Sequence, residues 1–456
     1  MRRSLPPLLI AATALAAPAA ASAHGLVQRS NLPIPEQLFV AGAVTVLVVS
    51  FGALAALWPK PRLESLPPWR ALPGGALLGS RAVEVLCGAI GVALFVVVVL
   101  AGYVGSGTAL ENLAPTFILI TSWVGLAFLS AIFGDVFRAF SPWRAIGRLL
   151  PRSDGLRPYP ERLGRWPAAA GLLAFTWIEL ASGWGEDPAL LVTAALGYTL
   201  LTLLAQILWG VEAWTRHGDA FGVWFGMFAM LAPIAWREDG RLVLRPPVAG
   251  AARLRALPGT VGLLVVGIGS TAFDGAKEGP LFGDVAPWLQ DRFTGLGMSK
   301  GLGLELAFVI GLAAAVLFVG AIWRLGTASV GGGRPFAHTL IPIAAAYVVA
   351  HYFSLLAYNG QDLWRLASDP LGQGSDLFGG AQSGIDYSVV SATAIWYAQV
   401  GALVTGHVAA LVLAHDRALV LFGGASDATR SQVVMLLLMV CFTCLGLWLL
   451  SAALNT

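Results

Sequence analysis

The sequence predicts an all-α protein, a polytopic bundle of about ten transmembrane helices preceded by a cleavable signal peptide. Three observations lead to this prediction. The 456 residues are 57% hydrophobic and only 12% charged, and the apolar residues gather in long stretches. Most arginines lie in every second loop between these stretches. A mean hydropathy of +0.75 is typical of proteins that span a membrane many times and not of soluble domains.

Residues 1–23 have the features of a secretory signal peptide. Two arginines precede an apolar stretch over residues 8–17, and a small-x-small cleavage site follows at Ala21-Ser22-Ala23. Cleavage there would make His24 the first residue of the mature chain and would place this end outside the membrane. Residues 24–456 are then expected to form one integral membrane domain.

An α-helix needs about 20 apolar residues to cross the hydrocarbon of a bilayer. Ten segments fit this requirement: 38–58, 82–104, 114–136, 167–185, 188–209, 257–273, 303–324, 335–357, 389–414 and 432–453. The apolar segment 221–236 is short and flanked by arginines, so we expect it to be interfacial or re-entrant and not to span.

The charged residues predict the orientation. The three loops expected on the inner side carry most of the arginines, whereas the outer loops are poor in basic residues. This positive-inside pattern agrees with the signal peptide. It predicts a protein of the cytoplasmic (inner) membrane with the mature N-terminus and the C-terminus on the outer face. Two outer loops, 274–302 and 358–388, are long enough to cover the bundle, although they could also be flexible connectors.

Ionisable side chains at membrane depth are costly and usually functional. On the expected outer side, Glu179, Asp274, Glu305 and His351 lie at similar depth, on the face where His24 also lies. Imidazole and carboxylate ligands suit a divalent transition metal such as zinc, copper or manganese. The alternative is that each side chain is satisfied locally by its neighbours.

A second, inner layer is expected from His338 and His407, which lie at similar depth on sequential antiparallel spans. These two histidines could meet and form a secondary site. The alternative is that both are core histidines hydrogen-bonded to nearby groups. A net charge of +3 gives no reason to expect nucleic acid as a partner, and no phosphate-binding G-x-x-x-x-G-K-[ST] motif is present.

Several stretches together carry a resemblance to a known group of proteins. They are Ala23-His24-Gly25-Leu26, Leu57-Trp58-Pro59-Lys60-Pro61-Arg62-Leu63, Arg138-Ala139-Phe140-Ser141-Pro142-Trp143-Arg144, Phe336-Ala337-His338-Thr339-Leu340-Ile341-Pro342, Ala350-His351-Tyr352, Trp396-Tyr397, Gly406-His407 and Ala414-His415-Asp416-Arg417. With these motifs the chain resembles bacterial multi-pass membrane proteins labelled fenitrothion hydrolase, after an inner-membrane enzyme that cleaves an organophosphate triester.

The resemblance implies a metal-dependent attack of hydroxide on a phosphotriester, with a metal lowering the pKa of bound water. In that case His24, His351 and Asp274 are the candidate ligands, Glu179 a further ligand or general base, and Glu305 a supporting group. A small hydrophobic substrate could arrive from the outer leaflet. Two alternatives stay open: a transporter or metal-handling permease that uses both histidine layers, and a membrane scaffold without a site.

Overall fold

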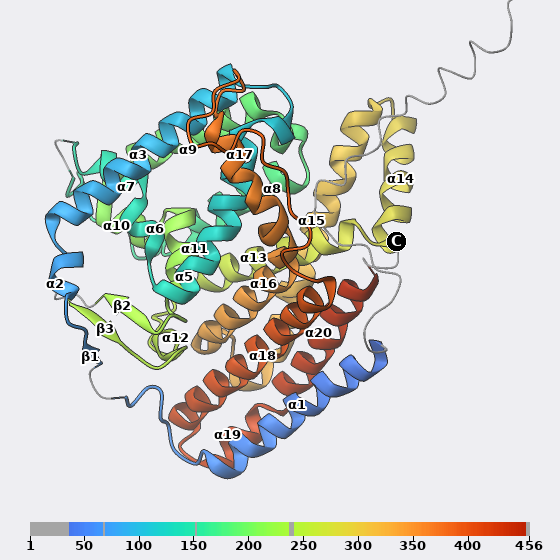
Figure 1. Ribbon diagram of the computed structural model, residues 1–456. Helices are drawn as coiled ribbons and strands as arrows, with labels where there is room; N and C mark the ends of the chain where they lie inside the picture. The colour runs from blue at the N-terminus through green and yellow to red at the C-terminus, as the bar shows by residue number, and fades with distance from the viewer. Residues whose placement is uncertain (1–35, 67–68, 151–152, 237–240, 453–456) are drawn as a thin grey trace, which may run out of the picture.

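The computed structural model describes residues 36–66, 69–150, 153–236 and 241–452, and the chain is predominantly helical, as expected (Figure 1). The signal peptide, His24 and the last four residues lie outside the described residues. The orientation of the two termini therefore stays a prediction.

Seven helical segments are long and apolar enough to cross a membrane. They are α1 (Glu36–Leu57), α3 (Arg81–Val104), α4 (Leu113–Pro115) continuing through η3 (Thr116–Gly125) and α5 (Leu126–Phe133), α9 (Pro188–Trp209), α15 (Lys300–Gly326), η6 (Arg334–Thr339) continuing into α16 (Leu340–Tyr358), and α18 (Ala392–Phe422). An eighth is obtained if α19 (Ala425–Ser431) and α20 (Val433–Ala452), which meet at a bend of 42°, count as one. A multi-pass membrane protein is thus supported, and the count of ten is not confirmed.

Two of the expected spans, 167–185 and 257–273, correspond to α8 (Trp166–Leu180) and α13 (Thr260–Lys277), which do not meet the same criteria. Helix α13 is central: it packs against α8, α15, α16 and α20, and most of its residues are buried (Figure 1). A helix enclosed by protein does not need the uniformly apolar surface that lipid demands. Because α13 ends in a polar turn, its mean hydropathy is lower than that of the seven candidate spans.

The segment 221–236 folds into α11 (Ala220–Ala229) and strand β2 (Ile234–Trp236). Helix α11 is too short to span, as expected, and its interfacial or re-entrant position relative to the membrane stays a prediction. Trp224 and Phe225 are almost completely buried, and α11 packs against α5 and α8. Strand β3 (Leu242–Leu244) lies between β2 and β1 (Arg70–Ala71) in a small antiparallel sheet, which the all-α expectation did not include.

The region 274–302 is largely helical and not a loop. It contains the last turn of α13 and then α14 (Pro280–Gly295), which packs against α15. The region 358–388 begins with η7 (Asn359–Gln361) and α17 (Asp362–Ser368) and continues as irregular chain. Arg365 of α17 donates to the carbonyl of Leu110 at 2.9 Å, so this region is attached to the bundle at that point.

The remaining short elements are α2 (Gly75–Leu78), η2 (Ala109–Glu111), α6 (Val136–Phe140), α7 (Pro142–Gly147), η4 (Gly183–Gly185), α10 (Val211–His217), α12 (Ala249–Ala252) and η5 (Ala328–Val330). Three of them, α6, α7 and α10, carry arginines that the sequence predicts on the inner side: Arg138, Arg144 and Arg216.

Glu212 of α10 organises three of the arginines predicted on the inner side. Arg138, Arg144 and Arg148 donate to its carboxylate at 2.7, 3.0 and 2.8 Å. Burial by itself would raise the pKa of Glu212, but the three guanidinium groups hold it below its usual value. The arginines that sequence analysis used as orientation signals therefore also join α6, α7 and α10.

Asp416 of α18 fixes the chain that follows α1. Its carboxylate accepts hydrogen bonds from the Trp58 indole at 3.0 Å and from the backbone amides of Arg62, Leu63 and Glu64 at 2.6 to 3.2 Å. Asp416 is buried. One carboxylate thus accepts hydrogen bonds from four N–H donors, which would otherwise have no partner once they are shielded from water.

Replacing Asp416 by alanine is expected to lower the free energy of unfolding by about 3 kcal/mol, because hydrogen bonds to a charged acceptor are lost and buried amides are left unpaired. Equilibrium unfolding in detergent micelles measures the effect. The control is Asp427→Ala in α19, where the side chain is exposed and the loss should stay below about 0.5 kcal/mol. Equal losses for the two variants would contradict the role given to Asp416.

Candidate functional site

A group of ionisable side chains surrounds Asp274 in the last turn of α13. This side chain is fully buried. Its Oδ2 atom lies 2.9 Å from His351 Nε2 and accepts a hydrogen bond of 2.7 Å from the Tyr352 hydroxyl. Its Oδ1 atom lies 3.0 Å from Lys277 Nζ. The carboxylate is therefore held between α13 and α16.

Local sequence places these partners. Lys277 follows Asp274 by three residues on a helix, a spacing that puts both side chains on one face. His351 and Tyr352 are consecutive on α16, and both reach the same carboxylate oxygen because α16 packs directly against α13. The imidazole keeps 10% of its side-chain exposure, whereas Asp274 has none. Lys277 keeps 9%, so His351 and Lys277 are the two partners of Asp274 at the edge of this buried group.

Glu179 of α8 adds a second carboxylate. It lies close enough to Asp274 and Lys277 to interact with both electrostatically. Its Oε2 atom is buried and has no hydrogen-bond partner among the described residues. We call the five side chains Glu179, Asp274, Lys277, His351 and Tyr352 the Asp274 cluster.

The charges of the Asp274 cluster do not balance by themselves. Two carboxylates face one ammonium group, and the imidazole of His351 adds a positive charge only when it is protonated. A surplus negative charge in a low-dielectric interior costs several kcal/mol. One further positive charge, a proton on a carboxylate or on His351 or a bound cation, removes this cost. A positive charge near these five side chains, beyond that of Lys277, is therefore favourable.

The positions of the sequence-derived candidates can now be stated. Glu179, Asp274 and His351 are brought together by three helices, in agreement with their common depth. Glu305 of α15 is not part of this group: its side chain is exposed and forms no hydrogen bond or ion pair within the described ranges. His24 lies outside the described residues.

Sequence analysis missed Lys277 and Tyr352. Lys277 was assigned to an outer loop, whereas α13 continues through it. The available signal was the spacing of three residues between Asp274 and Lys277 in a segment with helix-forming residues. Tyr352 follows His351 directly, but nothing in the sequence indicates that α13 lies opposite both.

A metal site is not evident at the Asp274 cluster. Within the part of the chain that the structure describes, no three His, Cys, Asp or Glu side chains are grouped so that they could hold a metal ion. Lys277 also supplies a positive charge at 3.0 Å from Asp274 Oδ1, where a metal ligated by this carboxylate would meet repulsion. Metal binding by His24, His351 and Asp274 stays a prediction.

The inner histidines each bond to backbone carbonyls. His338 Nε2 lies 3.4 Å from the oxygen of Leu413, and His407 Nδ1 lies 2.7 Å from the oxygen of Leu403. No hydrogen bond between the two histidines is present in the described chain. This agrees with the alternative reading of both as core histidines. His407 differs in one respect, since its Nε2 atom is buried without a partner among the described residues.

Helix α16 joins the outer and inner layers. Tyr347 lies one turn from His351, and its ring packs edge-on against the His407 ring with centroids 6.3 Å apart. Helices α16 and α18 form an extensive contact along their lengths (Figure 1). From the Asp274 cluster toward the inner layer, the side chains therefore follow one another as His351, Tyr347 and His407.

Comparison of the chain with protein-family models, with curated proteins and with solved structures gives no match. The functional argument consequently rests on the side chains described above.

Replacing Lys277 by methionine is expected to lower the free energy of unfolding by about 3–5 kcal/mol, because two buried carboxylates lose their cation. Adding Glu179→Gln to this variant should restore at least about 1 kcal/mol by removing one of the charges. Equilibrium unfolding measures both. Lys300→Met, at an exposed position of α15, is the control and should change little. No recovery in the double variant would contradict the shared charge balance.

Proposed function

We propose that the protein is a proton-translocating membrane transporter in which the Asp274 cluster is the proton-binding station. The single observation that carries this proposal is the Glu179 carboxylate: its buried Oε2 atom has no hydrogen-bond partner among the described residues, and it lies close enough to Asp274 to interact with it electrostatically. Ionisable groups enclosed at membrane depth are typical of proton and ion pathways. A buried carboxylate beside a second carboxylate can take up a proton and release it when its surroundings change.

The positions of His351 and Tyr347 support this proposal. His351 is partly exposed and hydrogen-bonded to Asp274, so it can pass a proton between the outer side and the carboxylate. Tyr347 continues along α16 toward His407. No hydrogen bond joins Tyr347 to either imidazole in the described segments, so a proton would advance beyond the cluster only after a movement of the helices, as alternating access requires.

Proton flux into liposomes tests the proposal. Purified protein is reconstituted with a pH-sensitive dye inside, and an imposed membrane potential drives protons inward. We expect Asp274→Asn and Glu179→Gln to reduce the flux at least tenfold, because each removes a protonatable group from the station. Glu305→Gln is the matched control, since it makes the same chemical change at an exposed site, and it should retain the wild-type flux. A wild-type rate equal to that of protein-free liposomes would contradict the proposal.

Hydrolysis of organophosphate triesters is the second candidate function. It is favoured by the Asp274–His351 hydrogen bond, because a carboxylate that orients an imidazole is a common arrangement for a general base. The nearby ammonium of Lys277 could stabilise negative charge on a phosphoryl oxygen. The resemblance to the fenitrothion hydrolase group points to the same chemistry, and a small hydrophobic substrate could reach this depth through the outer leaflet.

Release of nitrophenolate from a nitrophenyl dialkyl phosphate tests the second candidate, with and without added zinc, copper or manganese. His351→Ala should slow the reaction by about 10²-fold or more, the usual contribution of a general base. His217→Ala serves as the control, because His217 lies on α10 of the inner side and bonds only to the Ala213 carbonyl. Equal rates for the wild type, both variants and a protein-free sample would remove hydrolysis from consideration.

A further inference from the structure

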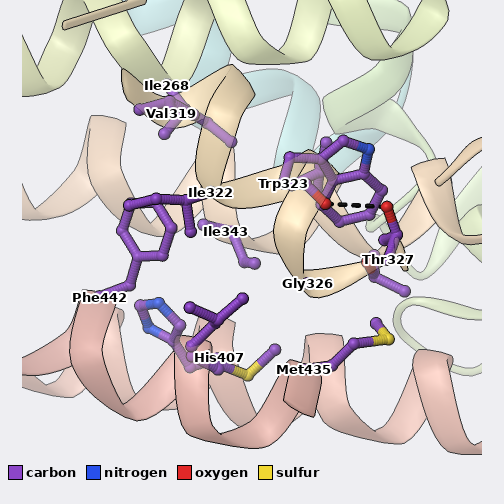
Figure 2. Close-up of a pocket in the computed structure, with 14 residues that line it drawn as sticks. Ile268, Val319, Ile322, Trp323, Gly326, Thr327, Ile343, His407, Met435 and Phe442 are labelled. Atoms are coloured by element: carbon purple, nitrogen blue, oxygen red, sulfur yellow. Dashed lines mark hydrogen bonds between the residues drawn. The ribbon is translucent and has the colours of Figure 1, made fainter. Parts of the chain in front are cut away.

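An apolar cavity of about 60 Å³ lies between α13, α15, α16, α18 and α20 (Figure 2). Its wall is formed almost entirely by aliphatic, aromatic and thioether side chains, among them Ile268, Ile343, Met435, Met439 and Phe442. His407 also lines it, and Figure 2 shows the imidazole between α18 and Phe442. The cavity is separate from the Asp274 cluster, since none of the five cluster residues lines it.

The protonation of His407 follows from its contacts. A backbone carbonyl only accepts hydrogen bonds, so the 2.7 Å contact with Leu403 places the proton of a neutral imidazole on Nδ1. Nε2 is then an acceptor with a free lone pair. His407 is 0% exposed, and within the described residues no donor reaches Nε2. A buried acceptor without a partner costs about 1–3 kcal/mol.

The other polar groups of the wall do not satisfy this acceptor. The Thr327 hydroxyl donates to the Trp323 carbonyl at 2.8 Å, and the Thr339 hydroxyl donates to the Phe336 carbonyl at 2.9 Å. A single water molecule is a poor occupant, because an ordered buried water needs about two to four polar partners and most of this wall is apolar. The missing partner is therefore a donor on a molecule that is otherwise apolar.

We propose that this cavity binds a membrane-dissolved molecule with a slim aliphatic body and one hydroxyl group, whose O–H donates to His407 Nε2. The size fits: the cavity exceeds the roughly 10–15 Å³ that one water requires and is smaller than the roughly 150 Å³ cavity that accommodates benzene. An alcohol of a few carbons, or the hydroxyl end of a longer chain, matches this space. Met435 and Met439 provide flexible, polarisable side chains that adapt to such a ligand.

The ligand would enter from the bilayer. Helices α15 and α20 form one side of the cavity, and both are long apolar helices with much exposed hydrophobic surface, including Leu317, Phe318 and Leu437. The wall residues Leu438 and Phe442 of α20 are only partly buried. A hydrophobic alcohol concentrated in lipid thus meets the cavity wall without crossing a polar region. The site does not depend on the proposed transport function.

The first experiment uses the unaltered protein, labelled with ¹⁵N-histidine and placed in lipid nanodiscs. Its probes are 1-butanol and diethyl ether, which have the same molecular formula but differ in the O–H donor. We expect 1-butanol to shift the Nε2 resonance of one of the six histidines in a saturable way and diethyl ether to leave it unchanged. No saturable shift with 1-butanol, or equal shifts with both compounds, would overturn the proposal.

The second experiment assigns the site. The shifted resonance should be missing in His407→Gln, and all other histidine signals should be retained. Binding of 4,4,4-trifluorobutan-1-ol, followed by ¹⁹F NMR, should be at least fivefold weaker in His407→Leu, the loss expected for one hydrogen bond of about 1 kcal/mol. His407→Gln, which keeps an acceptor oxygen, should recover part of the affinity. A shifted resonance that persists in His407→Gln, or unchanged ¹⁹F binding in His407→Leu, would overturn the assignment to this cavity.

Discussion

The buried carboxylate of Asp274 is the constraint on which the centre of the molecule depends. A charge in the interior of a membrane protein must be neutralised by partners at fixed positions, because neither lipid nor water is available to solvate it. These partners come from α13 and α16, and Glu179 of α8 shares them. The three helices therefore have to meet at one depth. The same requirement explains why α13 is enclosed by protein and carries polar residues in its last turn.

The ion pairs around Glu212 and those of the Asp274 cluster differ in the kind of positive charge that faces the carboxylates. Glu212 faces three arginines, which stay protonated at every accessible pH, so its negative charge is permanently satisfied. The Asp274 cluster has two carboxylates, one lysine and an imidazole that is hydrogen-bonded to Asp274. Histidine and neighbouring carboxylates exchange protons more readily than arginine does. This comparison favours a scaffold role for the inner network and an active role for the outer cluster.

The depth of a residue in a span can be predicted from the sequence, because an α-helix rises by a fixed distance per residue. Glu179, Asp274 and His351 share a layer and do meet. Glu305 was assigned to the same layer but points outward, because depth does not specify which face of a helix a residue occupies. Lys277 was missed because the end of α13 was read as a loop. The number of spans differs because α8 is only 15 residues long and α13, which other helices enclose, ends in a polar turn.

Helix α16 connects the two sites in a manner that sequence could not indicate. It supplies His351 to the Asp274 cluster, and it supplies Leu340 and Ile343 to the wall of the cavity beside His407. A ligand that shifts α16 on entering the cavity would alter the distance between His351 and Asp274, and hence the affinity of the cluster for a proton. Linkage then requires that protonation change the affinity of the cavity by the same factor. Charge at the outer layer and apolar occupancy near His407 would thus be coupled through one rigid element.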